Sequence, residues 1–164
     1  MDVRIINPLL SATLKVLTTM AMVEPTPGKP FICEDEYAHG VVSAVVGITG
    51  SVTGSMSITF TEPCIRELVK NLLGVDDDEV NQFIEDAVGE LTNMICGDAR
   101  VHLRKMGFRL KAGIPSIISG EKHRIEHLLD GPRLAVPFDT PHGQFIVEAV
   151  LGTQIQPATE DSDM

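Results

Sequence analysis

The segment from Asp78 to Met106 constrains the fold most, because it contains no proline and its apolar side chains recur with the period of a helix. These apolar positions are Val80, Ile84, Ala87, Leu91, Met94 and Ile95. We expect one helix of about seven to eight turns, since an α-helix has about 3.6 residues per turn. Asp76 or Asp77 is the expected capping residue, and Gly107 is the expected end.

A polar stripe runs along the opposite side of this expected helix. Its members follow one another at three- or four-residue steps: Glu79, Gln82, Asp86, Glu90, Asn93, Gly97, Arg100 and Arg104. A glycine inside a helix costs about 1 kcal/mol relative to alanine. Gly97 in the stripe and Gly89 beside it are therefore consistent with the close approach of another molecule's backbone. A solvated helix face that happens to contain two glycines explains the same pattern, and periodicity alone leaves both interpretations open.

The motif Asp86-xxx-Glu90-xx-Asn93-xxx-Gly97, followed by Asp98-Ala-Arg100, resembles the signature helix of the CheX/CheC/FliY family of chemotaxis phosphatases. The resemblance covers about residues 1–152. The single copy of the motif, the chain length and the flanking segments are most similar to the CheX branch. Proteins of the CheC type carry two such motifs, and the sequence contains no second Glu-x-x-Asn helix.

The resemblance implies an enzyme that dephosphorylates a phosphorylated CheY-type response regulator and so ends a chemotaxis or two-component signal. It implies that Asn93 positions the attacking water, which an amide can do because it both donates and accepts hydrogen bonds. Glu90 is implied to dock on the regulator's lysine, and Asp86 and Gly97 are assigned to partner docking. Mg²⁺ is expected to be held by the regulator, so no cofactor or metal of the chain's own is expected. A homodimer that joins sheets across subunits is also implied.

Two other functions are considered. A non-catalytic binding module of the same fold, which grips a response regulator or a flagellar switch protein, is the alternative; the absence of Glu90 or Asn93 would favour it, and both are present. A metal hydrolase at His123 and His127 is the third class. These histidines stand four residues apart but lack an evident third ligand, so we expect them on the surface of a loop or short helix. The sequence leaves their role open.

The charge of the chain excludes several kinds of partner. A net charge of −10 argues against nucleic acid and anionic membrane. No apolar run reaches about 18 residues, so no membrane span is expected, and the N-terminus lacks the layout of a signal peptide.

The cysteines Cys33, Cys64 and Cys96 are far apart and show no metal-ligand spacing, which predicts reduced thiols in a cytoplasmic protein.

The remaining elements are predicted from apolar patterns and from glycine and proline positions. In chain order they are a helix from Asn7-Pro8 to about Val23, a loop from Glu24 to Pro30, a strand covered on both sides at Val41–Ile48, a half-buried strand at Ser55–Thr61, a helix from Thr61 to Gly74, a strand at Phe108–Ile118 that lies at an edge or carries a bend, and strands at Arg133–Phe138 and Gln144–Leu151. The strands at Val41–Ile48 and Ser55–Thr61 are predicted to form a hairpin, and so are the last two. They predict an α/β (α+β) fold: a single CheX-like domain over residues 1–152, with a largely antiparallel sheet packed against the long central helix and shorter helices. Residues 153–164 are predicted to be an acidic, disordered tail.

Overall fold

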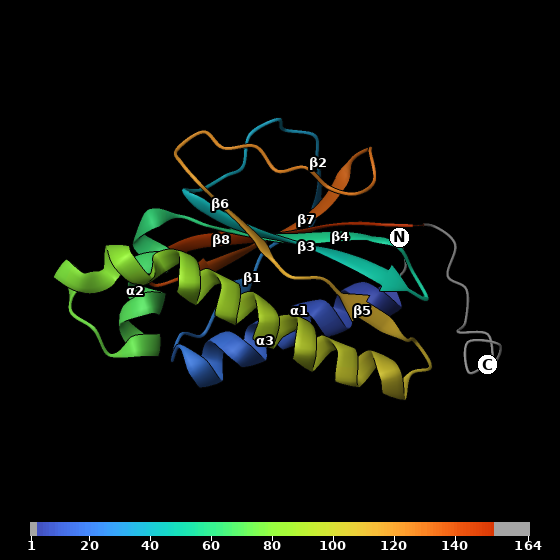
Figure 1. Cartoon of the computed structure of the whole chain (residues 1–164), viewed down its shortest axis with the longest axis horizontal. Coiled ribbons are helices and arrows are strands. Elements are labelled where there is room, and N and C mark those ends of the chain that lie inside the picture. The colour runs from blue at the N-terminus through green and yellow to red at the C-terminus, as the bar shows by residue number, and fades with distance from the viewer. Residues whose placement is uncertain (1–2, 153–164) are drawn as a thin grey trace.

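One antiparallel sheet carries the helices on one of its faces in the computed structural model, which describes residues 3–152 (Figure 1). The elements are α1 (Val3–Met20), β1 (Thr26–Pro27), β2 (Phe31–Cys33), β3 (Val42–Gly50), β4 (Gly54–Phe60), α2 (Glu62–Leu73), the 3-10 helix η1 (Asp77–Phe83), α3 (Ile84–Lys105), β5 (Leu110–Ala112), β6 (Ser116–Ser119), β7 (Arg133–Thr140) and β8 (Gly143–Leu151). The α/β (α+β) class is thereby confirmed. No helix among these residues is both long and apolar enough to span a bilayer. The tail predicted at residues 153–164 lies outside the described residues.

The sheet has eight strands, and its main path runs β1-β7-β8-β4-β3-β5. The pairs β3–β4 and β7–β8 form the two predicted hairpins. Both β5 and β6 pair with β3, one after the other along its length, so the predicted bent edge strand is confirmed. β2 pairs with β7 at the other edge. Every pair in the described part of the chain is antiparallel.

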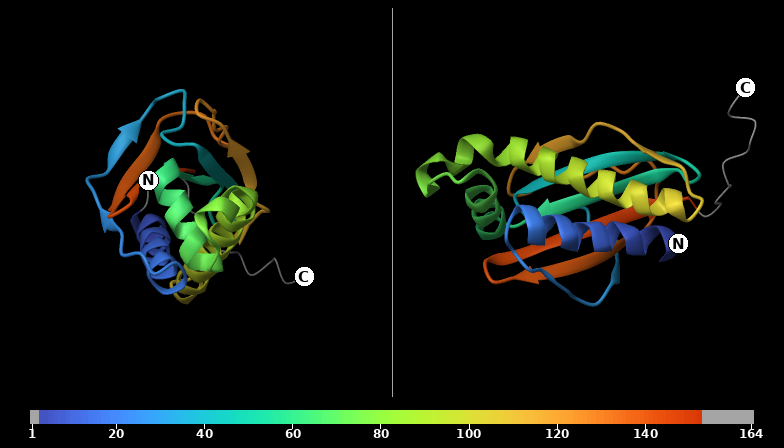
Figure 2. Two further views of the ribbon diagram at one scale, coloured as in Figure 1. Left: turned by 90° about the vertical axis from the view of Figure 1, so that its left-hand side faces the viewer. Right: turned by 90° about the horizontal axis from the view of Figure 1, so that it is seen from below.

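α1 and α3 lie side by side across the same face of the sheet (Figure 2). The predicted apolar face of α3 is confirmed, because Leu91, Ile95 and Leu103 are fully buried. Burying an aliphatic side chain contributes roughly 1.5–3 kcal/mol, so this face orients the helix. An ion pair adds a cross-link at its edge, where Lys15 Nζ lies 2.9 Å from a carboxylate oxygen of Asp98.

The start of the long helix differs from the prediction, because residues 77–83 form a 3-10 helix before α3 begins at Ile84. Asp76 takes the predicted N-cap position, at the start of η1, but makes no capping hydrogen bond through its side chain. The carboxylate of Asp77 pairs with Arg66 and Lys70 of α2, at 3.2 and 3.6 Å. The predicted end is confirmed, since α3 stops at Lys105 and Gly107 follows with φ 92°.

Two predictions for the N-terminal part are wrong. The first helix does not begin at Asn7-Pro8 but already includes Val3, because Ile5 and Ile6 bury their side chains in the core with the rest of the helix. The segment from Glu24 to Pro30 is not entirely loop. Two of its residues form β1 against β7, where an edge position tolerates a proline.

The strand β4 is buried on both faces, whereas the sequence predicted a half-buried strand. Its polar face is covered by the segment between β6 and β7, which crosses the sheet on the side away from the helices (Figure 1). The covering contacts are hydrogen bonds: His127 Nδ1 lies 2.7 Å from Ser55 Oγ of β4, and His123 Nε2 lies 2.6 Å from Ser43 Oγ of the neighbouring β3. Hydroxyl groups on a strand therefore did not mean exposure to solvent.

His123 and His127 are consequently not the surface histidines that the sequence predicted. His123 is 6% exposed, and the side chain of His127 is 4% exposed. Burial lowers the pKa of His127, although the nearby Glu148 carboxylate raises it and the Arg133 guanidinium lowers it further. The neutral imidazole is thus the form that the folded protein accommodates.

This burial predicts a stability that depends on pH. The unfolded chain protonates His127 near its ordinary pKa of 6.5, whereas the folded chain does so only at lower pH. The stabilisation that comes from a neutral His127 is therefore complete above the unfolded pKa. It is lost as the pH falls from the unfolded pKa through the lower, folded pKa. The free energy of unfolding should decrease less steeply between about pH 7.5 and pH 5 in His127→Gln than in the unaltered protein.

The control is Gln82→Ala, an exposed position without a titratable side chain, which should leave the slope unchanged. Denaturant titrations at several pH values measure the three slopes. Equal slopes for His127→Gln and the unaltered protein would show that the buried imidazole titrates normally.

Candidate functional site

The predicted polar stripe lies on the solvent side of α3. Asp86, Glu90, Asn93 and Gly97 are all exposed, whereas Ala87 and Leu91 beside them are buried. The helix therefore separates its two faces as the sequence predicted. Because the four stripe residues occupy successive turns of one helix, they form a continuous row along its surface.

Glu90 and Asn93 stand on a well-supported part of α3. Leu91 and Ile95, which flank Asn93 on the inner face, are fully buried. Thr92 is also buried, and its hydroxyl group donates to the carbonyl oxygen of Val88, with 2.7 Å between the two oxygens. Side chains that project from a packed helix are held more accurately than side chains on a loop. The helix thus fixes the backbone positions from which the Glu90 carboxylate and the Asn93 amide project, three residues apart.

Neither the Glu90 side chain nor the Asn93 side chain has a hydrogen-bond or ion-pair partner within residues 3–152. Their polar atoms face solvent and support no contact of the fold. By contrast, Glu85 on the same helix accepts a hydrogen bond from Ser119 of β6, with 3.0 Å between the oxygens. The Glu90 carboxylate and the Asn93 amide are therefore available to a molecule that approaches α3 from outside.

The two helix glycines are not required by the packing of the chain. A Cβ atom at Gly97 would meet nothing within 4 Å, and one at Gly89 would lie 3.8 Å from Ile117 Cδ1, an ordinary contact. A glycine at a helix position that has room for a side chain lowers stability without an internal reason. Free space above Gly97 is what the approach of another backbone needs.

The later part of the motif belongs to the fold rather than to an open surface. Arg100 is half-buried, and its Nε donates to the carbonyl oxygen of Leu110, 2.9 Å away. Asp98 accepts a hydrogen bond from Lys15 at 2.9 Å. His102 Nε2 lies 3.7 Å from the Asp98 carboxylate, within ion-pair range but beyond hydrogen-bond distance.

The histidines proposed as metal ligands do not share a site, since His123 and His127 bind different hydroxyl groups of the sheet. The described residues bring together a different set of ligand-type side chains, Cys33, Asp35 and His39. The sequence did not predict this set, because the three cysteines are far apart and show no metal-ligand spacing among themselves. The short spacing Cys-x-Asp-x-x-x-His is the signal that could have found it.

The family model for chemotaxis phosphatase CheX matches residues 42–139, which extend from β3 into β7 and include all of α3. The chain belongs to the CheX family. The members of that family are described as chemotaxis phosphatases. The matched residues include the whole exposed row on α3, which is Asp86, Glu90, Asn93 and Gly97. The CheX resemblance of the sequence is thereby confirmed.

Individual CheX-family proteins agree with this assignment. The chain is 47% identical to a CheX from Desulfovibrio desulfuricans. That match covers 90% of this chain and 99% of the other, with a TM-score of 0.82. The chain is 29% identical over 128 residues to the CheY-P phosphatase CheX of Thermotoga maritima, and this match covers 77% of this chain and 82% of the relative. It is 30% identical to the chain in the CheX-CheY-BeF3-Mg+2 complex from Borrelia burgdorferi, with coverages of 89% and 96% and a TM-score of 0.73.

The open surroundings of Gly97 predict that the fold tolerates a side chain there. Gly97→Ala should leave the free energy of unfolding unchanged or raise it by up to about 1 kcal/mol, because alanine is the better helix former. Chemical denaturation measures this difference.

Gly40→Ala is the matched control. A Cβ atom at Gly40 would lie 2.3 Å from the carbonyl oxygen of Phe60, so this variant should lose stability. A Gly97→Ala protein destabilised as strongly as Gly40→Ala would mean that the fold, and not a partner, requires the glycine.

Proposed function

We propose that this protein hydrolyses the phosphoaspartate of a phosphorylated CheY-type response regulator and so terminates a chemotaxis or two-component signal. One observation carries the proposal: a CheX-family chain presents Glu90 and Asn93, without partners in the described structure, on the outer face of its longest helix. The name of the Thermotoga maritima relative and the CheY-containing complex of the Borrelia burgdorferi relative support the choice of substrate.

Asn93 is proposed to position the attacking water. Hydrolysis forms a bond from water oxygen to phosphorus and breaks the bond from phosphorus to the aspartate oxygen, which leaves with the electron pair as a carboxylate. A carboxylate is a weak base, with a pKa of about 4, so its departure needs no proton donor. What the reaction needs is a water held in line with the leaving oxygen. The Asn93 carbonyl can accept from that water while the amide donates to a phosphoryl oxygen.

Glu90 is proposed to bind the lysine beside the regulator's phosphoaspartate. A carboxylate and an ammonium group form a charge-assisted hydrogen bond, which is stronger than a neutral one. Because Glu90 lies three residues before Asn93 on the same face, this contact would also fix where the Asn93 amide enters the partner's site. The row continues on either side, and we assign Asp86 and Gly97 to docking: Asp86 as a further polar contact, Gly97 as space for the partner's backbone.

Mg²⁺ is proposed to arrive with the regulator. The Borrelia burgdorferi complex contains Mg²⁺ together with CheY. The ion supplies charge neutralisation at the phosphoryl group, which complements the uncharged amide that this chain brings. The homodimer and the cytoplasmic location expected from the sequence stay predictions.

Asn93→Ala should lower the rate of phosphate release by about 100-fold or more, because a poorly placed nucleophile alone costs that much. The fold should be unchanged, since the Asn93 side chain is exposed. Phosphate release from a phosphorylated regulator with Mg²⁺ gives the rate, and calorimetry gives the affinity for the regulator. Gln144→Ala, which removes an exposed amide from β8, is the control and should keep full activity. A folded Asn93→Ala protein with normal turnover would exclude the water-positioning role.

Glu90→Gln should weaken binding to the phosphorylated regulator by about 10-fold or more, equivalent to about 1.4 kcal/mol, because it removes the charge from the proposed pair. Glu121→Gln removes an exposed carboxylate from the β6–β7 segment and should bind normally. An unchanged affinity together with a large loss of turnover would move Glu90 from docking to the chemical step.

A further inference from the structure

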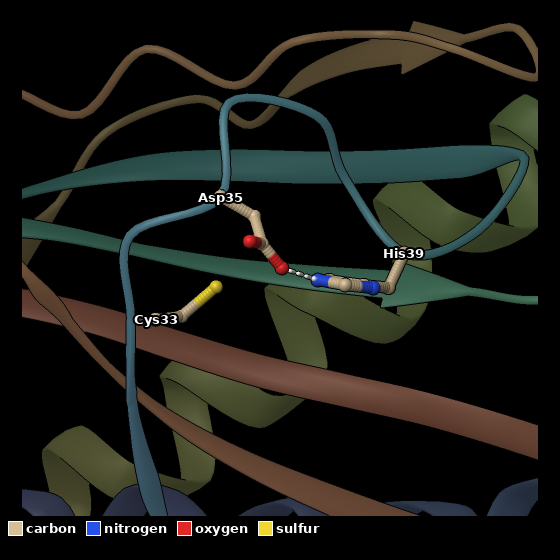
Figure 3. Close-up of side chains that lie close together, drawn as sticks. All are labelled: Cys33, Asp35 and His39. Atoms are coloured by element: carbon tan, nitrogen blue, oxygen red, sulfur yellow. Dashed lines mark hydrogen bonds and ion pairs between the residues drawn. The ribbon is translucent and has the colours of Figure 1, made fainter.

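Three metal-ligand side chains converge near the end of β2. Cys33 is the last residue of β2, and Asp35 and His39 follow in the connection to β3 (Figure 3). One ligand atom of each, the thiol sulfur, a carboxylate oxygen and an imidazole nitrogen, lies within 4.8 Å of the others. Asp35 Oδ2 and His39 Nε2 are 2.6 Å apart. The cluster thus gathers three different ligand chemistries from seven consecutive residues.

The backbone around the cluster is held in place by the sheet and its cover. The amide of Ala38 donates to the carbonyl oxygen of His123 at 2.9 Å. The amide of Val41 donates to the carbonyl oxygen of Phe60, also at 2.9 Å. Gly40 lies so close to Phe60 that a Cβ atom would approach its carbonyl oxygen to 2.3 Å. His39 is therefore fixed from both sides, and Cys33 is fixed by its pairing with Arg133 in β7.

The charges around the cluster suit a divalent cation. Arg133 Nη2 donates a hydrogen bond to Cys33 Sγ, 3.4 Å away. Arg133 Nε donates to Glu148 at 2.7 Å, so the positive charge is offset by a carboxylate on β8. With the ion bound, a thiolate at Cys33 and the carboxylate of Asp35 would supply two negative ligands.

We propose that Cys33, Asp35 and His39 form a Zn²⁺ site with its remaining coordination position open to water. Sulfur and imidazole nitrogen are ligands of borderline cations, whereas Mg²⁺ and Ca²⁺ prefer oxygen. Zinc bonds of about 2.0–2.3 Å require small side-chain movements from the present separations. On binding, a sulfur–zinc bond replaces the sulfur–hydrogen bond and the proton goes to solvent. His39 Nε2 donates to the Asp35 carboxylate in the metal-free structure, so coordination through Nε2 requires the neutral tautomer whose ring proton is on Nδ1.

The site lies on the side of the sheet opposite α3 (Figure 1), so it is separate from the proposed phosphatase face. A bound ion would join the end of β2 to the β2–β3 connection. That connection in turn contacts the covering segment through the hydrogen bond from Ala38 to His123. Zinc therefore stabilises the polar-face cover of the sheet and takes no part in the chemistry at Asn93.

Titration of the full-length, chelator-treated protein with Zn²⁺ and Co²⁺ tests the site. We expect one equivalent of either ion per chain and, with Co²⁺, a sulfur-to-metal charge-transfer band. Asp35→Asn and His39→Gln should each lower the affinity by at least about 10-fold, and Cys33→Ser should abolish the band. Because Asp35 and His39 are exposed, their variants should fold even if Cys33→Ser does not.

Cys64→Ala and His102→Gln are the controls, since they remove a thiol and an imidazole elsewhere. They should keep both the stoichiometry and the band. The absence of stoichiometric binding, or binding that the Asp35 and His39 variants leave unchanged, would overturn the proposal. Neither result would alter the account of α3, whose test is phosphate release.

Discussion

The packing of α3 against α1 and the sheet is the contact on which the rest of the structure depends. The fully buried side chains of Leu91, Ile95 and Leu103 fix the rotation of the helix about its axis. That rotation decides which residues face solvent, and it places Glu90 and Asn93 outward. Their arrangement is therefore a consequence of aliphatic burial on the opposite side of the helix, not of any contact that they make themselves.

The two faces of the sheet are covered by different chemistry. Helices and aliphatic side chains cover one face, whereas the β6–β7 segment covers the other with buried hydrogen bonds between hydroxyl groups and imidazoles, including the pairs Ser43–His123 and Ser55–His127. Buried polar groups of this kind are costly unless every one is paired. The proposed catalytic row thus stands on an apolar support, whereas the buried imidazoles of His123 and His127 lie on the far side of the sheet.

The sequence predicted what depends on local periodicity and missed what depends on distant partners. The orientation of α3, both hairpins and the bend between β5 and β6 followed from spacing and from glycine and proline positions. The burial of Ser55 could not be predicted, because its partner His127 lies more than 70 residues later in the chain. Asp77 failed as a cap because Arg66 and Lys70 attract its carboxylate. The importance of Glu90 and Asn93 came from the family resemblance, since periodicity alone describes any solvated helix face.

The central claim is that the exposed row on α3 turns over a phosphorylated regulator and does not merely bind it. The most direct measurement is the decay of the regulator's phosphoaspartate in the presence of Mg²⁺ and a small substoichiometric amount of this protein. The account predicts that all of the phosphorylated regulator is consumed over many turnovers, at an initial rate proportional to the amount of protein added. Decay at the spontaneous rate, or protection of the phosphoaspartate in a stoichiometric complex, would contradict it and would identify a non-catalytic binding module.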